Sequence, residues 1–90
     1  MWVFVFFDLP TGTPKERKAA TSFRQELLKD GFTMFQYSIY MRHCASMEQA
    51  QTHARRVKAM LPDEGEVVIM TLTDKQFGMM EHFSSRKPTD

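Results

Sequence analysis

One carboxylate, Asp8, stands where an apolar run ends, and its position suits either a structural or a chemical role. The run at residues 3–7 is VFVFF. Five consecutive β-branched or aromatic residues are typical of a strand buried on both faces, and residues 10–12 supply the turn that ends it. An aspartate at a strand end often hydrogen-bonds within the following turn. A lone carboxylate beside an apolar strand is also a candidate metal ligand or catalytic group, so both interpretations stay open.

No other carboxylate is expected at the end of a hydrophobic strand. Glu16 and Glu48 fall at expected helix starts, and further acidic residues fall in turns. One carboxylate is a weak magnesium site, because Mg²⁺ keeps several waters and usually takes one or two carboxylates with phosphate oxygens. Two copies of Asp8, brought together by the symmetry of a homodimer, would make a better one.

Three basic residues, Lys15, Arg17 and Lys18, follow the turn after Asp8, in the first turns of an expected helix. Phosphates bind to Lys, to Arg and to helix N-termini, and here these features coincide. A solvated helix face would carry the same charges, so a structural explanation stays open. The net charge is only +1, from 12 Lys and Arg against 11 Asp and Glu. Nucleic-acid binding would therefore depend on this local cluster.

Several kinds of site are excluded by what the sequence lacks. Cys44 is the only cysteine, so one chain can form neither an internal disulfide nor a cysteine-based zinc site. Glycine-rich nucleotide-binding loops are absent. The histidines, His43, His53 and His82, are expected to be exposed or half-buried polar residues. The apolar first segment is too short to span a bilayer and lacks a cleavage signal, which predicts a soluble cytoplasmic protein.

The first half of the chain predicts a helix between strands. Thr13 and Glu16 are spaced as a capping box that begins a helix, and Gly31 is suited to end it in the left-handed conformation. Residues 33–41 then alternate apolar and polar side chains with the period of a strand. Because no glycine-containing turn interrupts the alternation, it predicts one long strand and does not decide whether the chain bends within it.

The second half repeats the pattern and completes an α+β domain. A second capping box at residues 46–49 begins a helix, which residues 62–65 end. Residues 66–73 form a second apolar strand that is expected to be central in the sheet. We expect a single ferredoxin-like domain at residues 1–83 and a flexible tail at 84–90. A second subunit is expected to cover the exposed sheet face, where four aromatic residues remain: Phe4, Phe6, Phe35 and Phe77.

An ordered set of short motifs resembles the CRISPR-associated Cas2 family, particularly members from type II systems. The motifs cover nearly the whole chain: FDLPT at 7–11, ERKA at 16–19, FR at 23–24, LLKDGF at 27–32, QYSIY at 36–40 and TDKQF at 73–77. The resemblance implies a βαββαβ fold, so the long strand would bend near Ser38. It also implies a homodimer in which a C-terminal strand, about residues 79–83, adds to the partner's sheet.

The resemblance also implies two alternative activities. Members bridge dimers of the CRISPR integrase and help hold double-stranded DNA during new-spacer acquisition, the adaptation step of antiviral defence. Several members are described as magnesium-dependent endonucleases, hydrolases of RNA or DNA. In this family, Asp8 matches the metal-ligand and catalytic aspartate. Lys15 and Arg17 lie where basic residues contact DNA, and Ser38 and Tyr40 lie in the segment lining the dimer cleft.

Two departures from the family pattern bear on these activities. Phe7 stands where many members have Tyr, and Thr33 and Met34 stand where basic residues occur. Both departures argue against autonomous nuclease activity, since Phe cannot donate a hydrogen bond. We therefore expect first a CRISPR adaptation subunit that binds double-stranded DNA and the integrase. The alternative is a magnesium-dependent endonuclease acting on RNA or DNA through paired Asp8.

Overall fold

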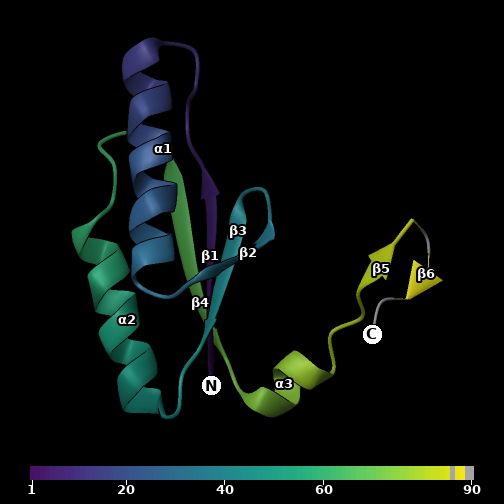
Figure 1. Ribbon diagram of the computed structural model, residues 1–90. Helices are drawn as coiled ribbons and strands as arrows, with labels where there is room; N and C mark the ends of the chain where they lie inside the picture. The colour runs from purple at the N-terminus through teal and green to yellow at the C-terminus, as the bar shows by residue number, and fades with distance from the viewer. Residues whose placement is uncertain (86, 89–90) are drawn as a thin grey trace.

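The main body of the protein is a four-stranded antiparallel sheet with two helices on one face (Figure 1). The computed structural model describes residues 1–85 and 87–88. The elements of the main body are β1 (Trp2–Asp8), α1 (Pro14–Lys29), β2 (Thr33–Gln36), β3 (Ile39–His43), α2 (Met47–Ala59) and β4 (Glu66–Leu72). The strand order is β2-β3-β1-β4. This βαββαβ arrangement confirms the expected α+β, ferredoxin-like fold.

Both long helices begin where the sequence predicts. The Thr13 hydroxyl accepts a hydrogen bond from the Glu16 amide at 3.1 Å, and the Glu16 carboxylate accepts one from the Thr13 amide at 2.9 Å. The first capping box is therefore confirmed, as is the left-handed Gly31, with φ of 86°. The second box is only half formed, because the Gln49 side chain accepts from the Ala45 amide instead of the cap residue.

The single long strand predicted from the alternation at residues 33–41 is wrong: this segment folds into β2 and β3. Tyr37 and Ser38 form the turn, and a bulge shifts the register between Met34 and Gln36. The Phe7 amide donates to the Ser38 carbonyl at 3.0 Å, which fixes the turn beside β1. Alternation continues through so short a turn, so periodicity could not reveal it. The bend near Ser38 that the family resemblance implied is confirmed.

The two faces of β1 have different surroundings. Val3, Val5 and Phe7 face the helices and are buried in the core with Phe23 and Leu27, among others. Since side chains alternate along a strand, the even-numbered residues lie on the opposite face, which we call the open face. The helix side of β1 is thus completely buried, whereas Met34 in β2 and Thr71 in β4 stay exposed on the same face.

The open face is partly covered by this chain itself. Phe4 is only 3% exposed, because the rings of Phe35 and Phe77 lie 5.8 and 6.1 Å from its own. Phe77 belongs to a short third helix, α3 (Asp74–Gly78), and also stacks on Trp2 at 3.8 Å. The expectation that these aromatic residues share a face is confirmed, although a second subunit is not needed to bury Phe4.

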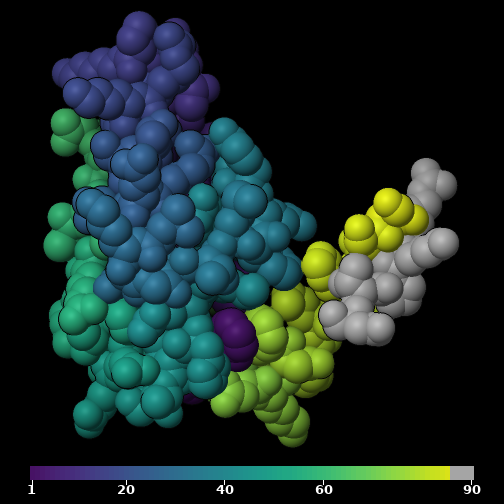
Figure 2. Space-filling view, in the orientation of Figure 1, coloured from purple at the N-terminus to yellow at the C-terminus, as the bar shows by residue number. Residues whose placement is uncertain are grey.

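The end of the chain differs from the expected pattern. The prediction that β4 is central in the sheet is wrong, since β4 lies at an edge beside β1. No strand occurs within residues 79–82. β5 (Phe83–Ser84) instead pairs with β6 (Lys87–Pro88) in a hairpin that projects from the body (Figure 1). Figure 2 shows the C-terminal segment before this hairpin, in yellow-green, beside the teal and blue main body. Residues 86, 89 and 90 of the expected flexible tail lie outside the described residues, and its flexibility stays a prediction.

Several apolar side chains remain exposed near β4 and the C-terminal segment. Val68 is 58% exposed, Met79 71% and Phe83 54%. In the part of the chain that the structure describes, no helix has the length and apolar character needed to cross a membrane. The homodimer, the addition of a C-terminal strand to the partner's sheet, and the cytoplasmic location stay predictions.

Candidate functional site

Asp8 lies on the open face directly opposite a second carboxylate, Glu66. Asp8 is the last residue of β1 and Glu66 the first of β4, and the two are paired in the antiparallel register. Residues paired in this way project from the same face with Cβ atoms about 5 Å apart. Both are exposed, and both line a shallow depression of about 240 Å³, with Ser38 on its other side. One protomer therefore supplies two carboxylates, where the sequence predicted one.

Gly65 makes this close approach possible. Its φ is 95°, a left-handed conformation that side chains disfavour. A Cβ on this residue would lie 2.7 Å from the carbonyl oxygen of Asp8 and 2.8 Å from the Leu9 side chain. The loop before β4 can therefore pass over the end of β1 only because residue 65 is glycine, and this passage places Glu66 beside Asp8.

The carboxylate pair has the donor chemistry of a divalent cation site. Among the described residues, neither Asp8 nor Glu66 has a hydrogen bond or an ion pair through its side chain. Like charges directly opposite on a sheet repel each other, and a bound cation removes that repulsion. Mg²⁺ takes one or two carboxylates and keeps waters, so this pair fits it. Within residues 1–85 and 87–88, no three or more His, Cys, Asp or Glu side chains gather as a metal cluster.

The two residues expected to line a dimer cleft lie in different places. Ser38 is half-buried and borders the depression beside Asp8. Tyr40 is 4% exposed and packs in the core, with its ring 5.6 Å from that of Phe7. The Tyr40 side chain thus lies beneath the helices, because its register partner, Val5, faces them. A cleft on the open face would meet Ser38 but not the Tyr40 ring, and the dimer cleft itself stays a prediction.

Phe7 does not affect the Asp8 carboxylate in the way the sequence suggested. Its side chain is 6% exposed and meets the Phe23 ring edge-on at 5.2 Å, in the core beneath the helices. Asp8 lies on the other face of the sheet. A tyrosine hydroxyl at position 7 would point away from the carboxylate pair, so its absence is no argument against nuclease activity in this chain.

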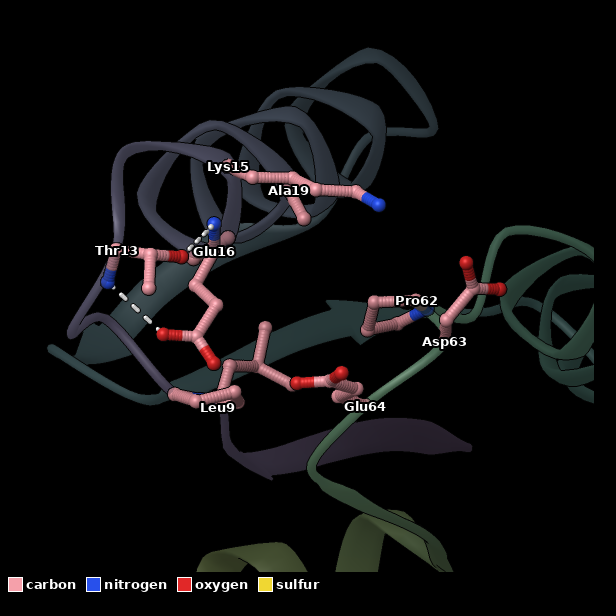
Figure 3. Close-up of a pocket in the computed structure, with 10 residues that line it drawn as sticks. Leu9, Thr13, Lys15, Glu16, Ala19, Pro62, Asp63 and Glu64 are labelled. Atoms are coloured by element: carbon pink, nitrogen blue, oxygen red, sulfur yellow. Dashed lines mark hydrogen bonds between the residues drawn. The ribbon is translucent and has the colours of Figure 1, made fainter.

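The basic cluster Lys15, Arg17 and Lys18 is exposed at the start of α1. The Arg17 guanidinium donates to the Thr11 carbonyl at 3.1 Å, which ties the cluster to the loop after Asp8. Lys15 lines a cavity of about 280 Å³ between α1 and the loop before β4. Figure 3 shows Asp63 and Glu64 across this cavity from α1. Within the described part of the chain, none of the three basic side chains forms an ion pair.

The expectation that all three histidines are exposed or half-buried is wrong for His53, which is 6% exposed. Its Nδ1 lies 2.7 Å from the Asp30 carboxylate, and Arg42 donates to its Nε2 at 3.0 Å. Because arginine can only donate, Nε2 accepts and the proton is on Nδ1. Arg56 donates to the other Asp30 oxygen at 2.8 Å. We call these four residues, Arg42, His53, Asp30 and Arg56, the Asp30 cluster.

Two carboxyl groups outside the Asp8 pair have altered pKa values. Burial acts to raise the pKa of Asp30, but hydrogen bonds from His53 and Arg56 outweigh it, and the pKa lies below its usual value. A hydrogen bond from the N-terminal ammonium group lowers the pKa of exposed Asp74, and His43 adds to this effect. These groups are engaged in structural contacts, which separates them from the exposed Asp8 pair.

The chain matches known proteins over almost its full length. The family model described as CRISPR associated protein Cas2 matches residues 1–80. A relative from Flavobacterium psychrophilum is 57% identical over 90 residues, covering 100% of this chain and 78% of the relative. A relative from Parvibaculum lavamentivorans is 55% identical over 87 residues, covering 97% and 86%. One from Streptococcus mutans is 35% identical over 89 residues, covering 99% and 82%. All three are named CRISPR-associated endoribonuclease Cas2, and this chain belongs to the Cas2 family of CRISPR-associated proteins.

Proposed function

We propose that this chain is a magnesium-dependent endonuclease that hydrolyses RNA phosphodiesters at Asp8. The observation that carries the proposal is the pairing of Asp8 with Glu66 on the open face. The names of the relatives, which describe endoribonucleases, support RNA as the substrate. The buried position of Phe7 removes one of the two sequence-based arguments against this activity, and the absence of basic residues at Thr33 and Met34 remains.

The carboxylates of Asp8 and Glu66 would hold the cation, and Asp8 of the second subunit in a homodimer would add to the set. Bound magnesium supplies positive charge that offsets the charge developing on the phosphate. In the reaction a water oxygen bonds to phosphorus, the bond to the leaving oxygen breaks, and a proton moves from the water to the leaving group. A carboxylate oxygen of Asp8 accepts the proton of the attacking water and then passes it to the leaving oxygen, which returns Asp8 to its starting state. Ile39 and Val68 line the same depression beside the two carboxylates.

The test is cleavage of a single-stranded RNA by the purified chain in the presence of Mg²⁺. We expect Asp8→Asn to lower the rate about 10³-fold, equivalent to about 4 kcal/mol of transition-state stabilisation, and EDTA to stop cleavage. Asp63→Asn is the matched control, because Asp63 is an exposed carboxylate in the loop that leads to Glu66. Cleavage that survives Asp8→Asn would reject the proposal and indicate a contaminating nuclease.

The exposed basic cluster favours a second function, binding of double-stranded DNA in the CRISPR adaptation complex. Lys15, Arg17 and Lys18 stand without ion-pair partners in the described part of the chain, at a helix start that suits phosphate. In this role the protein is a homodimer that bridges integrase dimers while they capture a new spacer. The exposed apolar side chains along β4, such as Val68, supply surface for these contacts.

Salt dependence tests the second function. We expect Arg17→Ala to weaken binding of a DNA duplex several-fold and to lower the slope of log affinity against log salt by about 1. Arg55→Ala, on the exposed face of α2, is the control and should change neither. Equal salt slopes for wild type and Arg17→Ala would reject this role for the cluster. Spacer integration by Asp8→Ala with the integrase present then separates the two functions, since only the nuclease needs Asp8.

A further inference from the structure

An aromatic ring stands exposed at the turn beside the candidate site. Tyr37 lies in the turn between β2 and β3 and is 72% exposed. The guanidinium carbon of Arg24, from α1, lies 4.5 Å from the centre of its ring. A cation over one face of a tyrosine ring is attracted by its π electrons. One face of the Tyr37 ring is therefore occupied from within the chain, and the remainder of the ring is open to solvent.

In the described part of the chain, the only partners of the Arg24 side chain are aromatic rings. In the described residues its side chain forms neither a hydrogen bond nor an ion pair, and its Nε is buried without a partner. The guanidinium also lies 5.5 Å from the centre of the Phe7 ring. Arg24 thus lies against two aromatic rings, and its contact restricts the orientation of the Tyr37 ring. A ring fixed in advance loses less conformational freedom when a ligand stacks on it.

The Tyr37 ring and the Asp8 carboxylate lie on opposite sides of one edge of the sheet. Arg24 and Phe7 place the Tyr37 ring on the helix side, whereas Asp8 and Ser38 line the depression on the open face. The turn at residues 37–38 separates the two sides and is held against β1 by the Phe7–Ser38 hydrogen bond. A chain that contacts both groups must bend around this turn.

We propose that Tyr37 is a nucleobase-stacking site for single-stranded RNA whose backbone passes the Asp8–Glu66 pair, with Arg24 as its positioning residue. This inference rests on the proposed nuclease function and specifies its substrate. Every base has a π face, so stacking on Tyr37 is largely independent of sequence. A single strand can bend around the turn and splay a base onto the ring. A duplex is too stiff to bend so sharply and has its bases already stacked.

The test uses a short single-stranded RNA that carries 2-aminopurine, whose fluorescence falls when the base stacks. Binding is measured with the full chain in EDTA, so that no cleavage occurs. We expect wild type and Tyr37→Phe to quench the probe equally, because both keep the ring. Tyr37→Leu should lose the quenching and bind the RNA about tenfold more weakly. Arg24→Met should give intermediate quenching, because the ring remains but is no longer fixed.

Phe83→Leu is the matched control, since Phe83 is another exposed aromatic residue, 54% exposed, away from the turn. It should bind and quench as wild type does. Quenching retained by Tyr37→Leu overturns the proposal. Light scattering measures the molar mass of the assembly. If Tyr37→Leu changes the number of subunits, the proposal is also overturned, because the ring would then pack against a second copy of the chain. Equal thermal unfolding of all variants excludes misfolding as the cause.

The stacking site and the nuclease can fail separately in this design. If wild type does not cleave RNA with Mg²⁺ but quenching still depends on Tyr37, the stacking site stands and the nuclease does not. If wild type cleaves while Tyr37→Leu cleaves and quenches equally well, the nuclease stands and the stacking site is rejected. A double-stranded RNA carrying the same label should show no quenching that depends on Tyr37.

Discussion

The Asp30 cluster and the Asp8–Glu66 pair are two groups of charged residues that differ in whether their side chains have partners within the chain. In the cluster, both Asp30 oxygens and both ring nitrogens of His53 have hydrogen-bond partners, and the Asp30 side chain is 12% exposed. In the pair, two carboxylates stand opposite each other, exposed and without a partner in the described part of the chain. The first arrangement satisfies its charges within the chain, whereas the second leaves them for a ligand.

Whether a charged side chain has partners within the chain is the difference that we use to tell structural polar residues from candidate ligand-binding residues. Partners that satisfy every polar atom favour one conformation and stabilise it, since a buried charge that loses a partner is costly. Adjacent like charges with no partner destabilise the fold unless something else binds them. We therefore expect substitutions in the cluster to change stability and substitutions in the pair to change activity.

The largest effect that we expect on stability is at the Asp30 cluster. Asp30→Ala removes the partner of both His53 and Arg56, and we expect the free energy of unfolding to fall by about 3 kcal/mol. Denaturant unfolding measures the change, with Asp74→Ala as the exposed control. RNA cleavage by the folded fraction should equal that of wild type. If Asp30→Ala instead loses cleavage while its stability is unchanged, the Asp30 cluster and not the Asp8–Glu66 pair would be the catalytic site.

The next largest effect is expected from a substitution at Gly65, which should lower both stability and activity. Gly65→Ala puts a Cβ against the Asp8 carbonyl and the Leu9 side chain at positive φ, which should cost about 2 kcal/mol. The same change displaces Glu66 from Asp8, so cleavage should fall more than the loss of folded protein explains. Gly78→Ala is the control, because its Cβ would meet no atom within 4 Å. Equal activity per folded molecule in both variants would show that Gly65 does not position the pair.

The sequence alone predicts the elements of this fold well, because local signals determine them. The capping box at Thr13 and the glycine at residue 31 mark both ends of α1, and the apolar runs mark β1 and β4. Periodicity does not show the turn at residues 37–38, since the turn interrupts neither the alternation nor the polar pattern, and only the family motifs implied it. The edge position of β4 was missed because an apolar run shows that a strand is partly buried but not which strand lies beside it.

The candidate site was predictable only in part, for a related reason. Asp8 stands out because it ends an apolar strand, whereas Glu66 becomes its partner only through the β1–β4 register. Register depends on which strands pair, and local patterns along the chain do not show that. The Asp30 cluster joins residues from α1, β3 and α2, so no spacing along the chain could reveal that His53 is buried. The family motifs implied the metal-ligand role of Asp8, whereas Glu66 and Tyr37 became candidates only from their positions in the structure.

A smaller effect separates the two carboxylates of the pair. Glu66→Gln removes one charged ligand and leaves Asp8, so we expect cleavage to need about tenfold more Mg²⁺ for half-maximal rate, about 1.4 kcal/mol in cation affinity. Stability should not fall, because the substitution removes a like-charge repulsion. The measurement is the cleavage rate against Mg²⁺ concentration, with Glu64→Gln as the control from the same loop. An unchanged Mg²⁺ dependence would leave Asp8 as the only carboxylate of the site in each protomer.

The smallest effect is a pH dependence that belongs to the Asp30 cluster. The pKa of Asp30 is lowered in the folded protein, so its contribution to stability is fully present above the unfolded value of about 3.9. That contribution is lost as the pH falls through the lower folded pKa. Asp30→Asn lacks it, and its stability should therefore decrease less steeply than that of wild type below about pH 4.

Salt makes this last measurement specific to Asp30. Asp74 also has a lowered pKa, but its side chain is 67% exposed and its partners are screened by salt. At about 1 M salt, where the Debye length is about 3 Å, the acid dependence that remains should come from Asp30, which is shielded from solvent. At high salt and low pH, wild type and Asp30→Asn could instead lose stability in parallel. Protonation of Asp30 would then not cost stability, and the Asp30 cluster would not differ from the Asp8–Glu66 pair in having its charges paired within the chain.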